Sequence, residues 1–71
     1  MLNKNKLRGK IAEAGMTVVT LAAAIGVNPA TLHRKINGET EFTRAEIQAI
    51  AEALNLTAEE VQEIFFARKL A

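Results

Sequence analysis

The chain has 71 residues, a formal net charge of +1 and no cysteine. This length suits one small domain, so residues 1–71 are expected to fold as a single unit. The lack of cysteine excludes disulfides and thiolate metal sites and is typical of a reducing compartment. No apolar run approaches the ~18 residues of a membrane span, and the N-terminus lacks a signal-peptide pattern, so we expect a cytoplasmic protein without a membrane partner.

Charge is divided unevenly along the chain. Residues 1–38 hold six basic residues against one glutamate (+5), whereas residues 39–71 hold three against seven glutamates (−4). A basic stretch attracts polyanions, so this division favours a nucleic acid as the partner of the first half. A plain solvated first helix would carry the same lysines, so charge alone leaves both interpretations open.

A first helix is predicted over residues 5–14. Leu7, Ile11 and Ala14 recur at helical spacing, which would turn one apolar stripe toward a core. Gly15 then ends the helix.

Two short helices joined by a tight turn are predicted between residues 17 and 38. Apolar residues at helical spacing mark the two helices: Leu21, Ala22 and Ile25, then Leu32 and Ile36. Thr17 can cap the first helix. Gly26 follows its end, where glycine adopts a positive φ without strain, and Asn28 with Pro29 signals the start of the second helix. So short a connection favours the sharp crossing of a helix-turn-helix.

Two further helices are predicted in the C-terminal half. Thr43 and Glu46 form a capping-box pattern ahead of a helix over residues 44–54, and Thr57 with Glu60 repeats it ahead of a fifth helix. No segment alternates long enough to predict a strand, so the fold class is all-α. The apolar residues expected in one core are Leu7, Ile11, Leu21, Ala22, Ile25, Val27, Leu32, Ile36, Phe42, Ile47, Ile50, Leu54, Val61, Ile64 and Phe65.

Several of these residues stand at spacings shared with a known family: Leu21-Ala22, Gly26-Val27, Leu32, Asn37-Gly38, the run Phe42 to Ile47, and Ile50, Leu54 and Leu56. On these features, over nearly its whole length, the chain resembles the Cro and lambda-repressor type (XRE-type) of helix-turn-helix, which includes many phage and bacterial transcriptional regulators. The resemblance implies a compact five-helix bundle that binds double-stranded DNA. The chain departs from the family at Val18, where Gln is common, and at Lys35, where an apolar residue is common.

The second helix of the motif is expected to carry the DNA contacts. If Leu32 and Ile36 point inward, the opposite face is basic and free of acid, and its N-terminal half would meet base edges in the major groove. The candidates for base contact, also implied by the resemblance, are Pro29, Ala30, Thr31, His33 and Arg34. Arg34 can fork to guanine O6 and N7. The candidates for phosphate contact are Thr17, Val18, Asn28, Lys35 and Asn37. An ordinary solvated face, with Thr17 as a plain cap, remains the alternative.

The side-chain inventory argues against an enzyme. The chain has no Cys, Ser, Asp, Tyr or Trp and a single histidine, so no catalytic residue is predicted. His33 has no second soft ligand, and the glycines stand singly, which leaves neither a metal site nor a phosphate-binding loop. We therefore expect no cofactor and no small-molecule ligand.

Two functions follow from these features. The leading hypothesis is a sequence-specific DNA-binding regulator, a phage-type repressor or Cro-like protein, that occupies an operator through the helix from Pro29 to Asn37. The alternative is a protein-interaction module of the same fold that binds another regulator through Val18, Val19 and Phe66. The two adjacent valines at a helix start have no firm explanation in the sequence.

A weak homodimer is also predicted, through the C-terminal helix. Phe66 is turned ~100° from Phe65 by helical geometry, and Leu70 follows at i+4, so the two would form an outward apolar patch. Packing of Phe66 against Leu2 within a monomer is the other interpretation.

Overall fold

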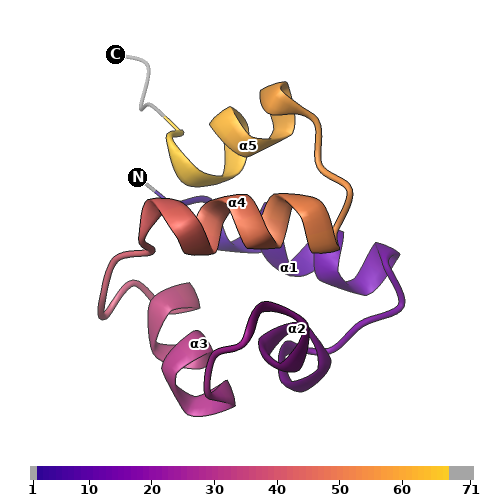
Figure 1. The fold of residues 1–71 in the computed structure, drawn as a ribbon. Coiled ribbons are helices and arrows are strands. Elements are labelled where there is room, and N and C mark those ends of the chain that lie inside the picture. Colours follow the sequence, from indigo (N-terminus) through magenta and orange to yellow (C-terminus); the bar gives the residue numbers. More distant parts are fainter. Residues whose placement is uncertain (1, 68–71) are drawn as a thin grey trace.

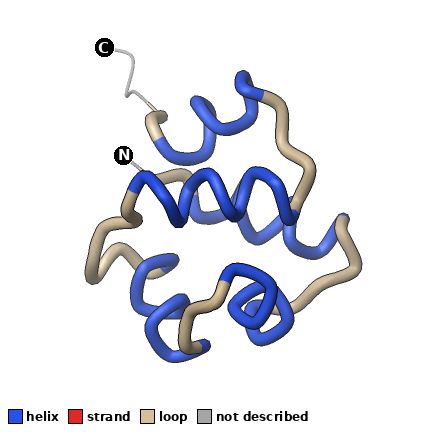
Figure 2. The backbone as a smooth tube through the Cα atoms, viewed as in Figure 1, coloured by secondary structure: helices blue, strands red, loops and turns tan. Residues whose placement is uncertain are grey.

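Five helices form the fold in the computed structural model, which describes residues 2–67 (Figure 1). They are α1 (Lys4–Glu13), α2 (Val18–Ile25), α3 (Pro29–Ile36), α4 (Arg44–Ala53) and α5 (Ala58–Phe65). No strand occurs among these residues, and the prediction of an all-α five-helix fold is confirmed (Figure 2). Within residues 2–67, no helix has both the length and the apolar character needed to cross a membrane.

Each helix begins at a side-chain cap, and the starts of α2 to α5 agree with the caps that the sequence predicts, whereas α1 begins one residue before its predicted start, at a cap that was not predicted. The caps are Asn3, Thr17, Asn28, Thr43 and Thr57. Each cap oxygen accepts a hydrogen bond from a backbone N–H in the first helical turn, a group that the helix itself leaves without a partner. Three of the starts are reciprocal capping boxes, at α2, α4 and α5.

The turn between α2 and α3 has the predicted conformation. Gly26 ends α2 with φ +76°, a left-handed conformation that an L side chain would strain. The N–H of Val27 donates to the carbonyl of Ala22 at 3.0 Å, and Asn28 is extended before Pro29 opens α3. This short connection closes the helix-turn-helix.

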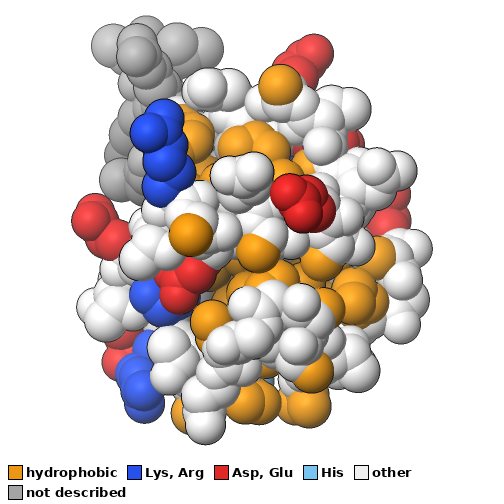
Figure 3. All heavy atoms as spheres, viewed as in Figure 1, with side chains coloured by type: hydrophobic (Ala, Val, Ile, Leu, Met, Phe, Trp, Pro, Cys, Tyr) orange, Lys and Arg blue, Asp and Glu red, His pale blue; other side chains and the backbone are white. Residues whose placement is uncertain are grey.

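The core lies where the helices face one another, with α4 across the middle, α2 and α3 on one side, α5 on the other and α1 behind (Figure 1). The buried apolar residues are Leu7, Ile11, Leu21, Ala22, Leu32, Ile36, Ile50, Leu54, Ile64 and Phe65. The remaining residues predicted for the core are half-buried and pack against it: Ile25, Val27, Phe42, Ile47 and Val61. They stay half-buried because a domain this small has few positions out of reach of water. Figure 3, viewed from the same side as Figure 1, shows apolar side chains at the surface between α4 and α2.

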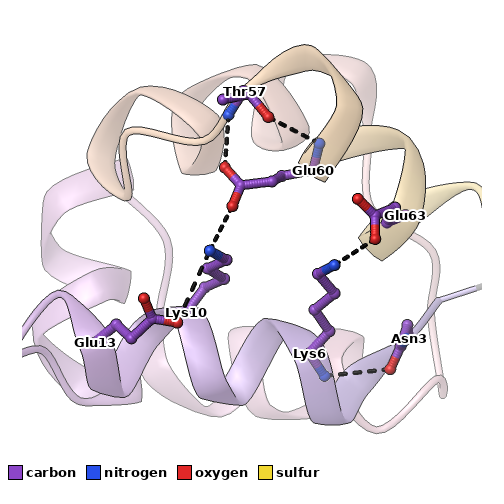
Figure 4. Close-up of polar contacts among 7 residues, drawn as sticks. All are labelled: Asn3, Lys6, Lys10, Glu13, Thr57, Glu60 and Glu63. Carbon is purple, nitrogen blue, oxygen red and sulfur yellow. Dashed lines mark hydrogen bonds and ion pairs between the residues drawn. The ribbon is translucent and has the colours of Figure 1, made fainter.

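Polar contacts fasten α1 to α5 (Figure 4). Lys6 pairs with Glu63, and Lys10 pairs with Glu60. The ammonium of Lys10 lowers the pKa of the Glu60 carboxyl to about 2, helped by the backbone N–H of Thr57, and the same contact raises the pKa of Lys10. Two lysines of the basic half are thus paired with glutamates of α5 at the surface.

The end of α5 differs from the prediction. The helix stops at Phe65, and Phe66 takes φ −127° and ψ 27°, which is not helical. The predicted continuation that would align Phe66 with Leu70 is therefore wrong at Phe66, and Leu70 itself lies outside the described residues. The sequence has no glycine or proline there to signal the end.

Candidate nucleic-acid interface

The second helix of the motif, α3, has one buried and one exposed side. Leu32 and Ile36, four residues apart, are fully buried. On the opposite side Ala30, His33 and Arg34 are exposed, whereas Pro29 and Thr31 are half-buried. The candidates for base contact therefore share the outer side of α3 and its N-terminal turn.

Arg34 lies along the surface of α3 and points back toward the start of the helix. Its Nη2 stands 3.5 Å from Oγ1 of Thr31, which is at the long limit for a hydrogen bond. No carboxylate of residues 2–67 forms an ion pair with it. The donors of this guanidinium are therefore left to a molecule outside the fold.

The starts of α2 and α3 both present backbone N–H groups without nearby acid. The Oγ1 of Thr17 accepts from the N–H of Thr20, and Oδ1 of Asn28 accepts from the N–H of Ala30 at 2.8 Å. Neither helix has an acidic residue in its first turn, so the partial positive charge of each N-terminus is not offset. The N–H of Val18, at the first position of α2, belongs to the groups that helical bonding leaves over.

The expectation for Lys35 is revised, because its ammonium is engaged within the fold. It lies 3.1 Å from Oε1 of Glu46 and donates to the carbonyl of Glu41 at 2.9 Å, with only 12% of its side chain exposed. Burial raises the pKa of the Glu46 carboxyl, but hydrogen bonds from the Thr43 N–H and from Lys35 outweigh burial and leave the pKa below its ordinary value. Lys35 therefore ties the end of α3 to α4 instead of facing outward.

Asn37, the residue that ends α3, has a partner that the sequence analysis missed. Nη2 of Arg8, on α1, donates to Oδ1 of Asn37 at 3.2 Å, and both residues are exposed. The spacing indicates only the side of α1: Arg8 is two residues from Lys6 and two from Lys10, so it lies on the other side of α1 from those paired lysines.

A family model described as a Cro/C1-type HTH DNA-binding domain matches residues 6–66. The chain belongs to this Cro/C1-type family. The match covers most of α1 and all of α2 to α5. No curated protein and no solved structure gives a significant match. Membership of this family supports a DNA-binding regulator whose partner is double-stranded DNA, and it points to a non-enzymatic role.

Within residues 2–67 of this Cro/C1-type domain, only some of the cations lie outside ion pairs and are available to DNA. Lys6, Lys10 and Lys35 are paired with glutamates, so the charge of +5 over residues 1–38 overstates what a polyanion would meet. Among residues 2–67 the basic side chains outside any ion pair are Lys4, Arg8, Arg34 and Arg44. Figure 3 shows the basic side chains of the visible face along one edge, on the side of α3 and the start of α4.

The apolar residues that the sequence left unexplained divide into two kinds. Val18 is half-buried and packs against the core, whereas Val19 is 57% exposed. Phe66 is 50% exposed and borders a groove of about 580 Å³ that Leu2 and Phe42 also line. Among residues 2–67 of this Cro/C1-type domain, Val19 and Phe66 are therefore the large apolar side chains open to a partner.

Groupings for metal chemistry do not occur in the described part of the Cro/C1-type domain. No three His, Asp or Glu side chains of residues 2–67 come together in a way that would hold a metal ion. Glu46 and Glu60 instead serve both as helix caps and as ion-pair partners.

Proposed function

We propose that the protein is a sequence-specific transcriptional regulator, a phage-type repressor or Cro-like protein, that occupies an operator through α3 and blocks polymerase there. The observation that carries this proposal is the outer side of α3, where His33 and Arg34 are exposed and neither is paired with an acid of the described residues. We also propose that residues 1–71 act as one domain.

The contacts divide into those that read bases and those that fix position. Base contact is assigned to Pro29, Ala30, Thr31, His33 and Arg34, as the N-terminal half of a recognition helix comes nearest the base edges. Phosphate contact is assigned to Thr17, Val18, Asn28 and Asn37, at helix ends. Val18 would act through its backbone N–H, since its side chain packs against the core.

A second copy of the protein on the same DNA site would supply the specificity that a single α3 lacks. One recognition helix contacts only a few base pairs, and two copies whose helices lie one DNA turn apart, roughly 34 Å, read a palindromic site. We propose that Phe66 contributes to this pairing, because it is half exposed at the edge of an apolar groove. The patch is small, so free dimers are expected to be weak.

The experiment selects bound sequences from a random DNA pool and then titrates single-base variants of the selected site. Arg34→Ala is expected to lose about 1–3 kcal/mol of discrimination at one base pair. Arg44→Ala is the matched control, because it removes the same charge from an exposed site on another helix. No enrichment from the pool refutes operator binding, and an Arg34→Ala protein that ranks the variants as wild type does refutes the role of Arg34.

The second candidate, an interaction module for another regulator, is favoured by the exposure of Val19 and Phe66. It predicts that Val19→Thr weakens binding to that protein and leaves DNA affinity unchanged. A fall in DNA affinity with Val19→Thr instead assigns Val19 to the DNA face.

A further inference from the structure

Arg8 differs from Lys6 and Lys10, its neighbours on α1, in the direction of its side chain. Lys6 and Lys10 point to α5, where Glu63 and Glu60 pair with them (Figure 4). Arg8 stands between them in sequence and reaches the far end of α3, where its Nη2 lies 3.2 Å from Oδ1 of Asn37. No carboxylate within residues 2–67 forms an ion pair with Arg8.

The contact fixes the orientation of the Asn37 amide. A guanidinium carries donors only, so Arg8 can bond only to the amide oxygen of Asn37. The amide nitrogen of Asn37 is thereby turned away from Arg8 as a free donor. The exposed end of α3 therefore offers a positive charge and several N–H groups side by side.

Docking of α3 in the major groove, as proposed above, would bring this pair near the DNA backbone. At 1.5 Å per residue, the eight residues of α3 extend about 12 Å, which is close to the ~12 Å width of the major groove. When the start of such a helix reads bases, its end reaches the edge of the groove. The phosphates that line this edge accept hydrogen bonds and attract cations.

We propose that Arg8 and Asn37 together bind one phosphate of the DNA backbone at the end of α3, with Arg8 as the cation and Asn37 as its neighbouring donor. The inference rests on the proposed function, because it requires α3 to lie in the major groove. It gives α1 a part in DNA binding and replaces Lys35, whose ammonium is held by Glu46.

The test compares Arg8→Gln with wild type in titrations of the selected DNA site at 50 to 200 mM salt. Arg8→Gln removes the charge and keeps an amide donor for Asn37. Loss of one phosphate contact lowers the slope of log affinity against log salt by about 0.9, so the advantage of wild type shrinks about 3.5-fold over this range. All DNA sequences are expected to weaken alike.

Lys6→Gln is the matched control, because it removes the same charge from the same helix at a residue paired with Glu63. It is expected to keep the wild-type slope. Arg8→Lys keeps the charge, so it is expected to keep the wild-type slope and serves as the charge-conserving control. The thermal midpoint of each variant shows whether it folds.

Each outcome decides a different point. A wild-type slope in Arg8→Gln overturns the assignment of Arg8, as does an equal loss of slope in Lys6→Gln, which would make the effect one of net charge. A change in the ranking of DNA sequences would mean that Arg8 reads a base and would also overturn it. Wild-type protein that binds without any salt dependence refutes the proposed function itself.

Discussion

The replacement of Lys35 by methionine separates a structural role from a DNA-binding one. Methionine keeps the unbranched stem of the side chain and removes the ammonium. That ammonium makes two contacts, with Glu46 Oε1 at 3.1 Å and with the Glu41 carbonyl at 2.9 Å. Because the side chains of Lys35 and Glu46 are only 12% and 17% exposed, solvent screens this pair less than a surface ion pair.

Charge-assisted hydrogen bonds contribute a net of about 1.5–3 kcal/mol, and Glu46 keeps its bond from the Thr43 N–H in the variant. Lys35→Met is therefore expected to lower the free energy of unfolding by about 2 kcal/mol. In a domain of this size that loss lowers the thermal midpoint by roughly 8–16 °C.

Thermal unfolding followed by circular dichroism at pH 7 measures the loss, and DNA titrations at several salt concentrations measure the binding role. Lys35→Met should keep the wild-type salt slope at a temperature where both proteins are folded. The double variant with Glu46→Gln should lose less than the sum of the two single variants, because the two side chains share one contact. If Lys35→Met keeps the thermal midpoint of wild type but lowers the salt slope of DNA affinity by about 0.9, this reasoning is refuted and Lys35 contacts a DNA phosphate.

Three further predictions concern the turn, the α1–α5 contact and pairing. Gly26→Ala is expected to destabilise the fold by about 1 kcal/mol or more, because φ is +76° there. Gly9→Ala, in the middle of α1, should instead stabilise the fold by about 0.5–1 kcal/mol. Urea midpoints equal to that of wild type in the two variants would contradict both predictions. Glu60 contributes fully to the free energy of unfolding above its unfolded pKa of about 4.3, and this contribution is lost as pH falls through its folded pKa of about 2. In urea unfolding, the difference in stability between wild type and Glu60→Gln should therefore narrow between these two pH values and stay constant above pH ~5. Phe66→Ala is expected to abolish cooperative filling of a palindromic site in footprints, and an unchanged two-site footprint would exclude pairing through Phe66.

The elements of the fold could be predicted because their signals are local. Thr43 and Glu46 are three residues apart, and the capping box that they form depends on nothing outside that turn. Likewise, the positive φ of Gly26 follows from its place after a helix of known phase. Residues at helical spacing then identified the core, since α2 and α3 must each bury one side.

The partners of the charged residues could not be predicted, because they depend on how helices cross. Lys10 and Glu60 are fifty residues apart, and no pattern in the sequence brings them together. For the same reason the sequence predicts a phosphate contact for Lys35, whose ammonium in fact meets Glu46, and it shows Arg8 only as part of a basic half. Spacing predicts on which side of a helix a charge lies, whereas tertiary packing decides what the charge meets.

The capping box of α2 places stability and binding in opposition at one position. In α4 and α5 the reciprocal partner is a glutamate, whose carboxylate also suits the positive end of a helix, but in α2 it is the hydroxyl of Thr20. A glutamate at position 20 would complete the stronger form of the cap, yet it would set a negative charge beside the helix start that we assign to a phosphate. Selection for stability alone would therefore favour glutamate at position 20 and weaken the proposed binding of phosphate at the start of α2. On this assignment, Thr20 gives up some stability of the fold and keeps the affinity for DNA.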